Sequence, residues 1–198
     1  MTEKEKMLKG ELYNANYDKE LIKEREQVKD LCFQYNNTLP SNRKRQRELL
    51  SQILAKDNDN ILIEAPFYCD YGYNIKVGKN FYANHGLVLL DAGTIEFGDN
   101  VFIGPGCHFY TSHHPFKKEI RNEGLEYASP IKVGNDVWFG GNTCIVPNVT
   151  IGDNVIIGAG SVIVDDIPSN SIAVGNPCKV IKKIDGDTII SIPKIEKL

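Results

Sequence analysis

Residues 131–164 read IKVGNDVWFGGNTCIVPNVTIGDNVIIGAGSVIV, and an apolar residue recurs at every sixth position of this stretch. The recurring residues are Val133, Phe139, Ile145, Ile151, Ile157 and Ile163, with glycine directly after four of them. A small or β-branched residue lies two places before each. Neither the 3.6-residue period of a helix nor the alternation of a single strand gives this spacing, whereas six-residue repeats are typical of parallel β-helices. The stretch therefore predicts a chain that coils in short strands.

The same phase continues upstream of this stretch. It includes Val77, Ala83 and Leu89 in one block and Phe97, Ile103 and Phe109 in another. Three hexads make one triangular turn, so each coil would use about eighteen residues and stack on the previous one at roughly 4.8 Å. Two interruptions break the phase: two extra residues between Leu89 and Phe97, and a long excursion over 112–131. Long loops in repeat folds usually carry function, so the excursion is a candidate site.

Residues 1–60 differ from the coils, since they are rich in Lys, Glu, Gln and Leu. Apolar residues on one face predict a helix that begins after Asp18 and fades near Asn36, and a second helix that begins at Ser41. These helices are expected to cap the open strand edge of the first coil. We predict a helical region over 1–60 that ends in a polar turn at 57–60, a parallel β-helix over 61–184 whose last strand is basic, and a tail over 185–198.

The composition of the 198 residues excludes several classes of protein. The net charge of -3 does not suggest a nucleic-acid binder, and no apolar run is long enough to cross a membrane. The charged start, Met1 to Lys9, has no apolar core of a secretory signal, so we expect a cytoplasmic protein without nucleic-acid or membrane partners. The five cysteines are widely separated, without the spacing of zinc or redox sites, and are expected to be buried free thiols.

Histidine is scarce, and two of the four histidines are adjacent at the start of the excursion. His113 and His114 directly precede Pro115, where an imidazole that titrates near neutral pH could act as a general base. Isolated histidines are also common on surfaces without any function. A zinc site built from His85, His108 and His113 is a further alternative, but His85 and His108 are twenty-three residues apart, which does not fit an eighteen-residue coil.

Several motifs along nearly the whole chain resemble those of the maltose and galactoside O-acetyltransferases of the hexapeptide-repeat superfamily. They are Glu5–Met7 with Gly10–Tyr13, Cys69–Ile75, Tyr110–Pro115, Asp136–Gly141 and Val174–Pro177. The resemblance implies transfer of an acetyl group from acetyl-CoA to a sugar hydroxyl. It also implies a homotrimer with active sites between subunits and a reaction that uses no metal. It also implies a left-handed coil, although parallel crossovers are right-handed in about 98% of cases.

The resemblance assigns roles on the acceptor side of the site. It implies that His114 is the catalytic base, with His113 as a bystander, and that Asn84 lies near the base and contacts substrate. Asp91 matches the acid of the acceptor pocket, although galactoside enzymes have that acid one position later. Asp70 and Glu126 match two further acceptor positions. One family acid is missing near Asn14 and Ala15.

On the cofactor side, the resemblance implies that Trp138 packs on the pantetheine arm of acetyl-CoA. Gly141 and Ala159 match positions whose backbone meets the thioester and the pantetheine, and the Gly141 amide is the expected oxyanion donor. Lys179 and Lys182 match residues that face the CoA phosphates. The chain departs from the family at Val164–Asp165, where many members have Thr-Lys, so an acid replaces a lysine near the cofactor.

Other functions remain open at this stage. A transferase of the same superfamily could use an antibiotic, an amino acid or an oligosaccharide signal as the acceptor in place of a simple sugar. A catalytically silent trimer that binds a partner or a metal belongs to a different class. The presence of His114, Asn84 and Trp138 together argues against the silent alternative.

Overall fold

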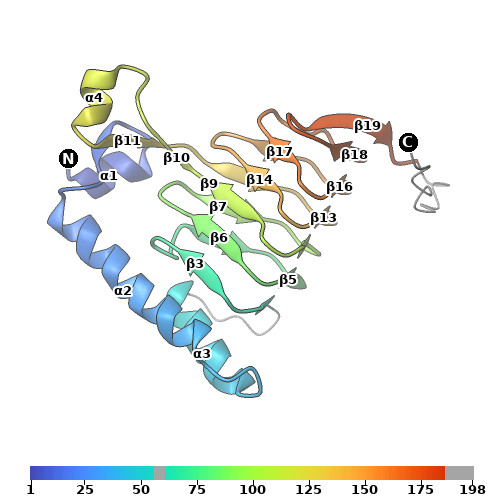
Figure 1. Cartoon of the computed structure of the whole chain (residues 1–198), viewed down its shortest axis with the longest axis horizontal. Helices are drawn as coiled ribbons and strands as arrows, with labels where there is room; N and C mark the ends of the chain where they lie inside the picture. The colour runs from blue at the N-terminus through green and yellow to red at the C-terminus, as the bar shows by residue number, and fades with distance from the viewer. Residues whose placement is uncertain (56–60, 186–198) are drawn as a thin grey trace.

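The computed structural model describes residues 1–55 and 61–185. The predicted polar turn at 57–60 and residues 186–198 of the predicted tail lie outside the described residues. Short strands stack along one axis, and the two longer N-terminal helices lie across the end of this stack where the first strands are (Figure 1). The two ends of the described chain lie at opposite sides of the molecule.

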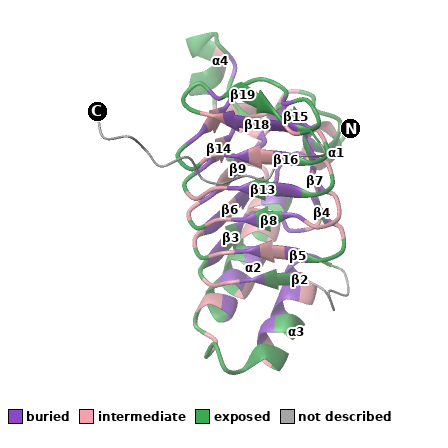
Figure 2. Ribbon diagram, turned by 90° about the vertical axis from the view of Figure 1, so that its right-hand side faces the viewer, coloured by how far each residue is buried: buried purple, intermediate pink, exposed green. Residues whose placement is uncertain are grey.

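The strands form three parallel sheets, which are the three faces of a prism. Face I contains β4 (Ile75–Val77), β7 (Ile95–Phe97), β12 (Ile131–Val133) and β15 (Thr150–Ile151). Face II contains β2 (Ile61–Ile63), β5 (Phe81–Ala83), β8 (Phe102–Ile103), β13 (Val137–Phe139), β16 (Val155–Ile157), β18 (Ser171–Val174) and the antiparallel β19 (Lys179–Lys183). Face III contains β3 (Phe67–Cys69), β6 (Leu87–Leu90), β9 (His108–Tyr110), β14 (Cys144–Ile145) and β17 (Val162–Ile163). Consecutive strands from β2 to β9 and from β12 to β18 belong to different faces, so the chain coils (Figure 2).

The fold is a left-handed parallel β-helix, as the sequence resemblance implied. The preference for right-handed crossovers arises from the twist of strands. Strands of the coil have only two to four residues, apart from the antiparallel β19. Such short strands accumulate little twist, so the usual preference has little influence here.

The length of a coil changes along the axis. Register partners are eighteen residues apart from Val137 to Val155, which confirms the predicted coil length for the stretch that begins at residue 131. The earlier coils are longer than predicted, since Ile75 pairs with Ile95, twenty residues further along the chain. The last coil is shorter, because Val155 pairs with Ser171 at a spacing of only sixteen residues. The extra residues of the early coils lie in the turns from face III to face I.

The core consists of the inward residues of the three faces (Figure 2). Phenylalanine rings pack edge-to-face within it, with centroids 5.0 Å apart for Phe97 and Phe109 and 5.3 Å apart for Phe109 and Phe139. Residues with positive φ line one corner of the prism, namely Asn80, Asn100, Asp136, Asn154 and Asn170. Side-chain hydrogen bonds join Asn80 to Asn100 and Asn100 to Asp136, so this corner repeats from coil to coil.

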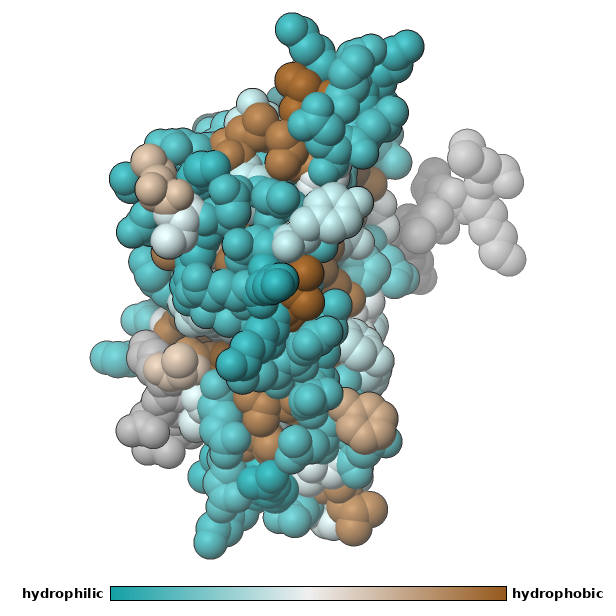
Figure 3. All heavy atoms as spheres, turned by 90° about the vertical axis from the view of Figure 1, so that its left-hand side faces the viewer, coloured by the Kyte–Doolittle hydropathy of each residue, from teal (hydrophilic) through white to brown (hydrophobic). Residues whose placement is uncertain are grey.

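The helices cover the first coil. The first predicted helix is α2 (Lys19–Asn36), with Asp18 as its N-cap as expected. The second, α3 (Arg43–Ile53), is capped by Asn42 and begins two residues later than predicted, because the Asn42 side chain accepts a hydrogen bond from the Arg45 amide. The Asn36 side chain pairs with both backbone groups of Phe67 in the edge strand β3. The surface seen from the helical side is mostly hydrophilic (Figure 3).

Two further helices were not predicted. They are α1 (Glu3–Leu8), which has a capping box at Thr2, and α4 (Lys118–Asn122) in the excursion. The excursion also forms β10 (Ser112–His113) and β11 (Leu125–Ala128), which make a small antiparallel sheet with β1 (Tyr13–Asn14). The excursion is therefore anchored to the N-terminal region. None of the helices in the described ranges is long and apolar enough to span a membrane.

Candidate active site

A pocket of about 400 Å³ lies where the excursion meets the N-terminal region and the turns between faces III and I. We call it the acceptor-side pocket. Its lining includes Tyr13, Asn16, Arg25, Lys29, Asp70, Tyr71, Tyr110, Ser112, His114 and Glu126. Three of the residues predicted from the sequence, His114, Asp70 and Glu126, are therefore brought together.

The orientation of the His114 ring suits a general base. Its Nδ1 atom lies 3.1 Å from the carbonyl oxygen of Leu125. Because a carbonyl oxygen can only accept a hydrogen bond, Nδ1 carries a proton, and in the neutral ring Nε2 then has the lone pair. Nε2 lies 3.9 Å from Oε1 of Glu126, and the His114 side chain is half exposed. A substrate proton can therefore reach Nε2.

The neighbouring His113 has a different environment. Its Nε2 atom lies 2.9 Å from Oγ of Ser129, and its ring stacks on Tyr127 with centroids 5.5 Å apart. Burial lowers the pKa of His113, and the nearby His114 lowers it further. His113 does not line the acceptor-side pocket. These contacts fit a structural role for this ring.

Tyr13 is a pocket residue that the sequence reasoning did not identify as functional. Strand β1 pairs with β11 so that Tyr13 lies opposite Glu126, and the Tyr13 hydroxyl donates a hydrogen bond of 3.1 Å to Oε2 of Glu126. Burial raises the pKa of this phenol, so the hydroxyl remains a donor. Tyr13 was visible in the sequence only as part of the Gly10–Tyr13 motif, because its pairing with the excursion is long-range.

Asp91 does not have the exposure that its predicted role requires. Its side chain is completely buried, and its Oδ1 atom accepts hydrogen bonds of 2.9 and 2.8 Å from the amides of Asp70 and Tyr71. Asp91 does not line the acceptor-side pocket of this chain, and its contact with an acceptor stays a prediction. Asp91 instead holds the turn that directs Asp70 into the pocket. Burial raises the pKa of Asp70, while Lys29 and Arg25 oppose this shift.

A second pocket, of about 610 Å³, lies on face II and contains three other predicted residues. Asn84, Trp138 and Gly141 line it, together with Tyr82 and Phe102. The Asn84 side chain accepts a hydrogen bond of 2.7 Å from the His85 amide, and Trp138 is 54% exposed. Within the described residues, the Gly141 amide has no hydrogen-bond acceptor. We call this pocket the thioester-side pocket.

The structure separates His114 from Asn84 within one chain, since the two residues line different pockets. The sequence reasoning expected them near each other in the assembled enzyme. A single chain therefore carries two incomplete halves of the predicted site.

The remaining predicted cofactor residues lie in the last coils. A Cβ atom added to Gly140 would come within 2.5 Å of the Ala159 amide nitrogen, so the turns at Gly141 and Ala159 stack directly.

Lys179 forms an ion pair of 2.8 Å with Asp165, and both side chains are exposed. Val164 is 43% exposed, and Lys182 lies on β19 opposite Ile172. The acid that replaces the family lysine thus neutralises a neighbouring lysine.

The three-histidine alternative has no geometric support. In residues 1–55 and 61–185, no three or more His, Cys, Asp or Glu side chains gather closely enough to hold a metal ion. Four cysteines are buried free thiols as expected, whereas Cys144 is only partly buried because it faces outward on β14.

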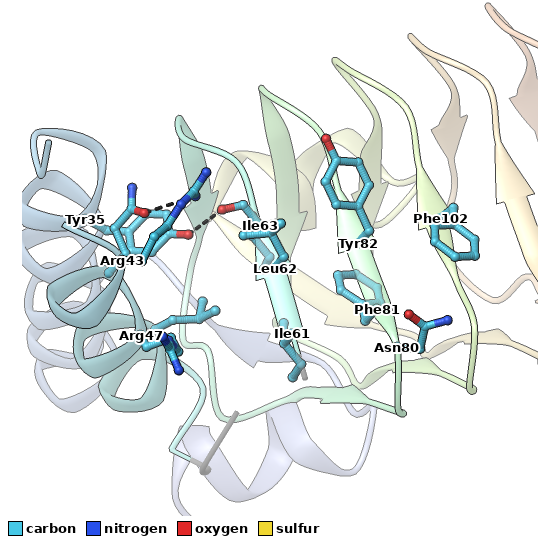
Figure 4. A pocket seen from close by; sticks show the side chains of 12 residues that line it. Tyr35, Arg43, Arg47, Ile61, Leu62, Ile63, Asn80, Phe81, Tyr82 and Phe102 are labelled. Carbon is cyan, nitrogen blue, oxygen red and sulfur yellow. Dashed lines mark hydrogen bonds between the residues drawn. The ribbon is translucent and has the colours of Figure 1, made fainter. Parts of the chain in front are cut away.

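A pocket of about 640 Å³ lies between α3 and the lower part of face II (Figure 4). Arg43 and Arg47 from α3 face Leu62 and Tyr82 across it. It contains none of the predicted site residues.

Comparisons with known proteins show the family to which the chain belongs. Residues 6–57 match the family described as the maltose acetyltransferase hexapeptide capping motif, and residues 130–165 match six repeats of the bacterial transferase hexapeptide. The crystal structure of a maltose O-acetyltransferase from Clostridium difficile 630 is 52% identical, with a TM-score of 0.91 over 93% of this chain and 98% of that one. The chain belongs to the maltose and galactoside acetyltransferase family.

Other members of the family are also similar over most of their length. A galactoside acetyltransferase in complex with coenzyme A is 38% identical, with a TM-score of 0.86 over 93% of this chain and 92% of that one. An acetyltransferase-like protein of Saccharomyces cerevisiae is 50% identical over 91% of this chain and 92% of its own length. This family member is therefore an acetyltransferase.

The different environments of the two adjacent histidines lead to a first prediction. We expect His114→Ala to lower kcat by about 10²–10⁴, because the reaction loses its general base, while acetyl-CoA still binds. His113→Ala, the matched control, should change kcat only slightly. Steady-state kinetics with a free-thiol readout for CoA measure both variants. Equal losses in the two variants would reject the assignment.

The buried carboxyl of Asp91 leads to a prediction about stability. Burial raises the pKa of Asp91 to about 6, whereas an Asp in an unfolded chain titrates near about 3.9. Because the pKa of Asp91 is higher in the folded protein than in the unfolded chain, protonation of this carboxyl stabilises the fold. This stabilisation is complete below about pH 4 and is lost as the pH rises through about 6.

We therefore expect Asp91→Asn, which cannot ionise, to gain stability relative to the unmodified protein as the pH rises from about 4 to about 8. The gain should reach at most about 3 kcal/mol, since each pKa unit corresponds to about 1.4 kcal/mol. Denaturant unfolding at the two pH values measures the difference between the proteins. A difference that stays constant with pH would show that Asp91 does not titrate in this range.

Proposed function

We propose that this protein transfers the acetyl group of acetyl-CoA to a hydroxyl group of a sugar. The observation that carries the proposal is the His114 ring, whose Nδ1 is engaged by the Leu125 carbonyl so that Nε2 is available beside a pocket. Asp70 and Glu126 line the same pocket. Carboxylates accept hydrogen bonds from hydroxyl groups, so this lining suits a polyhydroxylated acceptor.

The proposed reaction is a direct transfer. Nε2 of His114 removes the proton of the acceptor hydroxyl while the hydroxyl oxygen attacks the thioester carbonyl. The Gly141 amide donates to the oxyanion of the tetrahedral intermediate, a contribution of about 2.7–4 kcal/mol for a donor of this kind. The intermediate then expels the CoA thiolate, and the protonated His114 returns a proton to the sulfur. Asn84 is proposed to contact the substrate beside the base.

Acetyl-CoA is the proposed acetyl donor, and a member of the family has been crystallised with coenzyme A. We propose that Trp138 packs on the pantetheine arm, that the Ala159 backbone contacts it further along, and that Lys179 and Lys182 face the phosphates. Val164 and Asp165 would then lie beside the cofactor. No step of this scheme uses a metal. Because acetyl-CoA is an intracellular metabolite, we propose that the reaction takes place in the cytoplasm.

A homotrimer with active sites between its subunits is proposed on the basis of the prism faces. The outward residues of face I are mostly charged, and Lys76 and Glu96 form an ion pair of 2.8 Å there. Face II instead carries an apolar outward row, namely Leu62, Tyr82, Phe102, Trp138, Ile156 and Ile172. The outward row of face III is Tyr68, Val88, His108, Cys144 and Val162.

Contact between face II of one subunit and face III of the next would cover both apolar rows and repeat around a three-fold axis. It would also bring the acceptor-side pocket of one subunit toward the thioester-side pocket of another. This arrangement accounts for the separation of His114 from Asn84 within one chain.

A panel of acceptors tests the proposed chemistry. Release of CoA is followed by free-thiol detection with maltose, glucose and galactosides, and with amino acids and aminoglycoside antibiotics as non-sugar acceptors. We expect acetylated sugar esters as products. Turnover with only amine acceptors would overturn the sugar assignment, and no turnover with any acceptor would overturn the proposed reaction.

Mixing inactive subunits tests whether the site is shared. His114→Ala and Asn84→Ala are each expected to be inactive alone. In trimers assembled from equal amounts of both, a site works only when an intact His114 meets an intact Asn84 from the next subunit, so about one quarter of the full activity should return. Mixing unmodified protein with the double variant is the control for subunit exchange. Absence of any recovery in exchanged trimers, or an active monomer in sedimentation, would refute shared sites.

The ion pair between Asp165 and Lys179 leads to a prediction about cofactor affinity. We expect Asp165→Lys to lower the KM for acetyl-CoA several-fold with kcat nearly unchanged, because it frees Lys179 and removes a negative charge near the phosphates. The gain should shrink at high salt, since exposed charges are screened. Glu96→Lys, which breaks the matched ion pair on face I, should leave this KM unchanged. An unchanged KM for Asp165→Lys at low ionic strength would remove Asp165 from the cofactor site.

A further inference from the structure

Two thiols face each other beside the acceptor-side pocket. Cys32 lies in α2 and Cys69 is the last residue of β3, and their Sγ atoms are 3.9 Å apart. Both side chains are buried at the contact between the helix and the coil. The two residues are thirty-seven positions apart, so only the packing of α2 on β3 brings them together. The mechanism described above uses neither thiol.

A pocket of about 680 Å³ gives small molecules a route to this pair. Cys32 and Cys69 both line it, as do Phe33 and Tyr68. Lys29, Asp70 and Leu90 line both this pocket and the acceptor-side pocket, so the two pockets adjoin. The thiol pair is therefore next to the proposed sugar site and is accessible from it.

The pKa values of the two thiols shift in opposite directions. A hydrogen bond from Cys69 lowers the pKa of Cys32, whereas the same hydrogen bond and burial raise the pKa of Cys69. The thiolate is the reactive form of cysteine, so Cys32 would react first. Cys69 would then be the thiol that resolves the product, because among residues 1–55 and 61–185 its sulfur is the only one in contact with the Cys32 sulfur.

We propose that Cys32 and Cys69 form an oxidisable dithiol that a hydroperoxide converts into a disulfide between α2 and β3. In the first step, the Cys32 sulfur attacks a peroxide oxygen, the O–O bond breaks, and the hydroperoxide leaves as an alcohol, or as water when it is hydrogen peroxide. Cys32 becomes a sulfenic acid. In the second step, the Cys69 sulfur attacks the Cys32 sulfur, the S–O bond breaks, and hydroxide leaves with the Cys69 proton as water. Two electrons pass from the thiols to the peroxide.

The new bond would change the acceptor-side pocket. The sulfurs must approach from 3.9 Å to about 2.05 Å. Asp70 directly follows Cys69 and lines the pocket, so a shift at Cys69 moves this carboxylate. This consequence rests on the proposed function: oxidation should raise the KM for the sugar acceptor several-fold. The KM for acetyl-CoA should change little, because Trp138 and Gly141 line a different pocket.

The experiment treats the whole protein with hydrogen peroxide, then blocks free thiols and maps disulfides after digestion without reductant. We expect the mass of the oxidised protein to be lower by two hydrogens. We also expect the digest to contain one pair of peptides joined by a bond between Cys32 and Cys69, and dithiothreitol should reverse both changes. Cys32→Ser and Cys69→Ser should each abolish the bond, whereas Cys144→Ser, which removes a partly buried thiol on β14, should retain it. The map of the unmodified protein identifies the bond even if a variant fails to fold.

The possible results separate the dithiol from the proposed function. Oxidation of single thiols without a cross-link, or a bond between other cysteines, overturns the dithiol. A Cys32–Cys69 bond with an unchanged acceptor KM leaves the dithiol in place but overturns its effect on the site. If the reduced protein acetylates no acceptor, the proposed function fails, and the peptide map still decides whether the disulfide forms.

Discussion

Backbone hydrogen bonding between successive coils is the constraint on which the rest of the structure depends. Each coil lies directly on the next, so a corner has no room for a side chain that points along the axis. A Cβ atom added to Gly98 would lie 2.7 Å from the carbonyl carbon of Gly134 in the next coil. Corners therefore use glycine at the close approach and Asn or Asp where φ is positive. The strands between them point two side chains inward per hexad, as at Val137 and Phe139.

The chain departs from this regular stacking at a single corner in three successive coils. The turns from face III to face I contain two extra residues after Cys69 and again after Leu89, and the third contains the whole excursion. Asp70, Asp91 and His114 come from these three turns in order. Insertions at one corner stack on one another, so Asp70 and His114, which are far apart in sequence, both line the acceptor-side pocket, while Asp91 is buried. The buried Asp91 side chain joins the first two turns, because its Oδ1 atom accepts hydrogen bonds from the amides of Asp70 and Tyr71.

The other half of the candidate site follows from regular stacking. Gly104, Gly141 and Ala159 lie at the same corner in successive coils, and Trp138 projects from face II beside them. This side needs no insertion, because an extended cofactor can lie along a regular edge. The excursion is held by its pairing with β1, so the N-terminal region and the coils together orient His114.

The sequence by itself determined the repeat, the apolar interior, the α2 helix with its Asp18 cap, the interruptions and the family. Each of these depends on local spacing or on matched motifs, which the order of residues contains directly. The tertiary structure decided the twenty-residue length of the early coils, the partnership of Tyr13 with Glu126 and the contact of Cys32 with Cys69. It also decided that Asp91 is buried and that His114 and Asn84 line separate pockets. These features depend on which corners absorb extra residues and on how the helices pack, and long-range packing leaves no periodic signal in a single sequence.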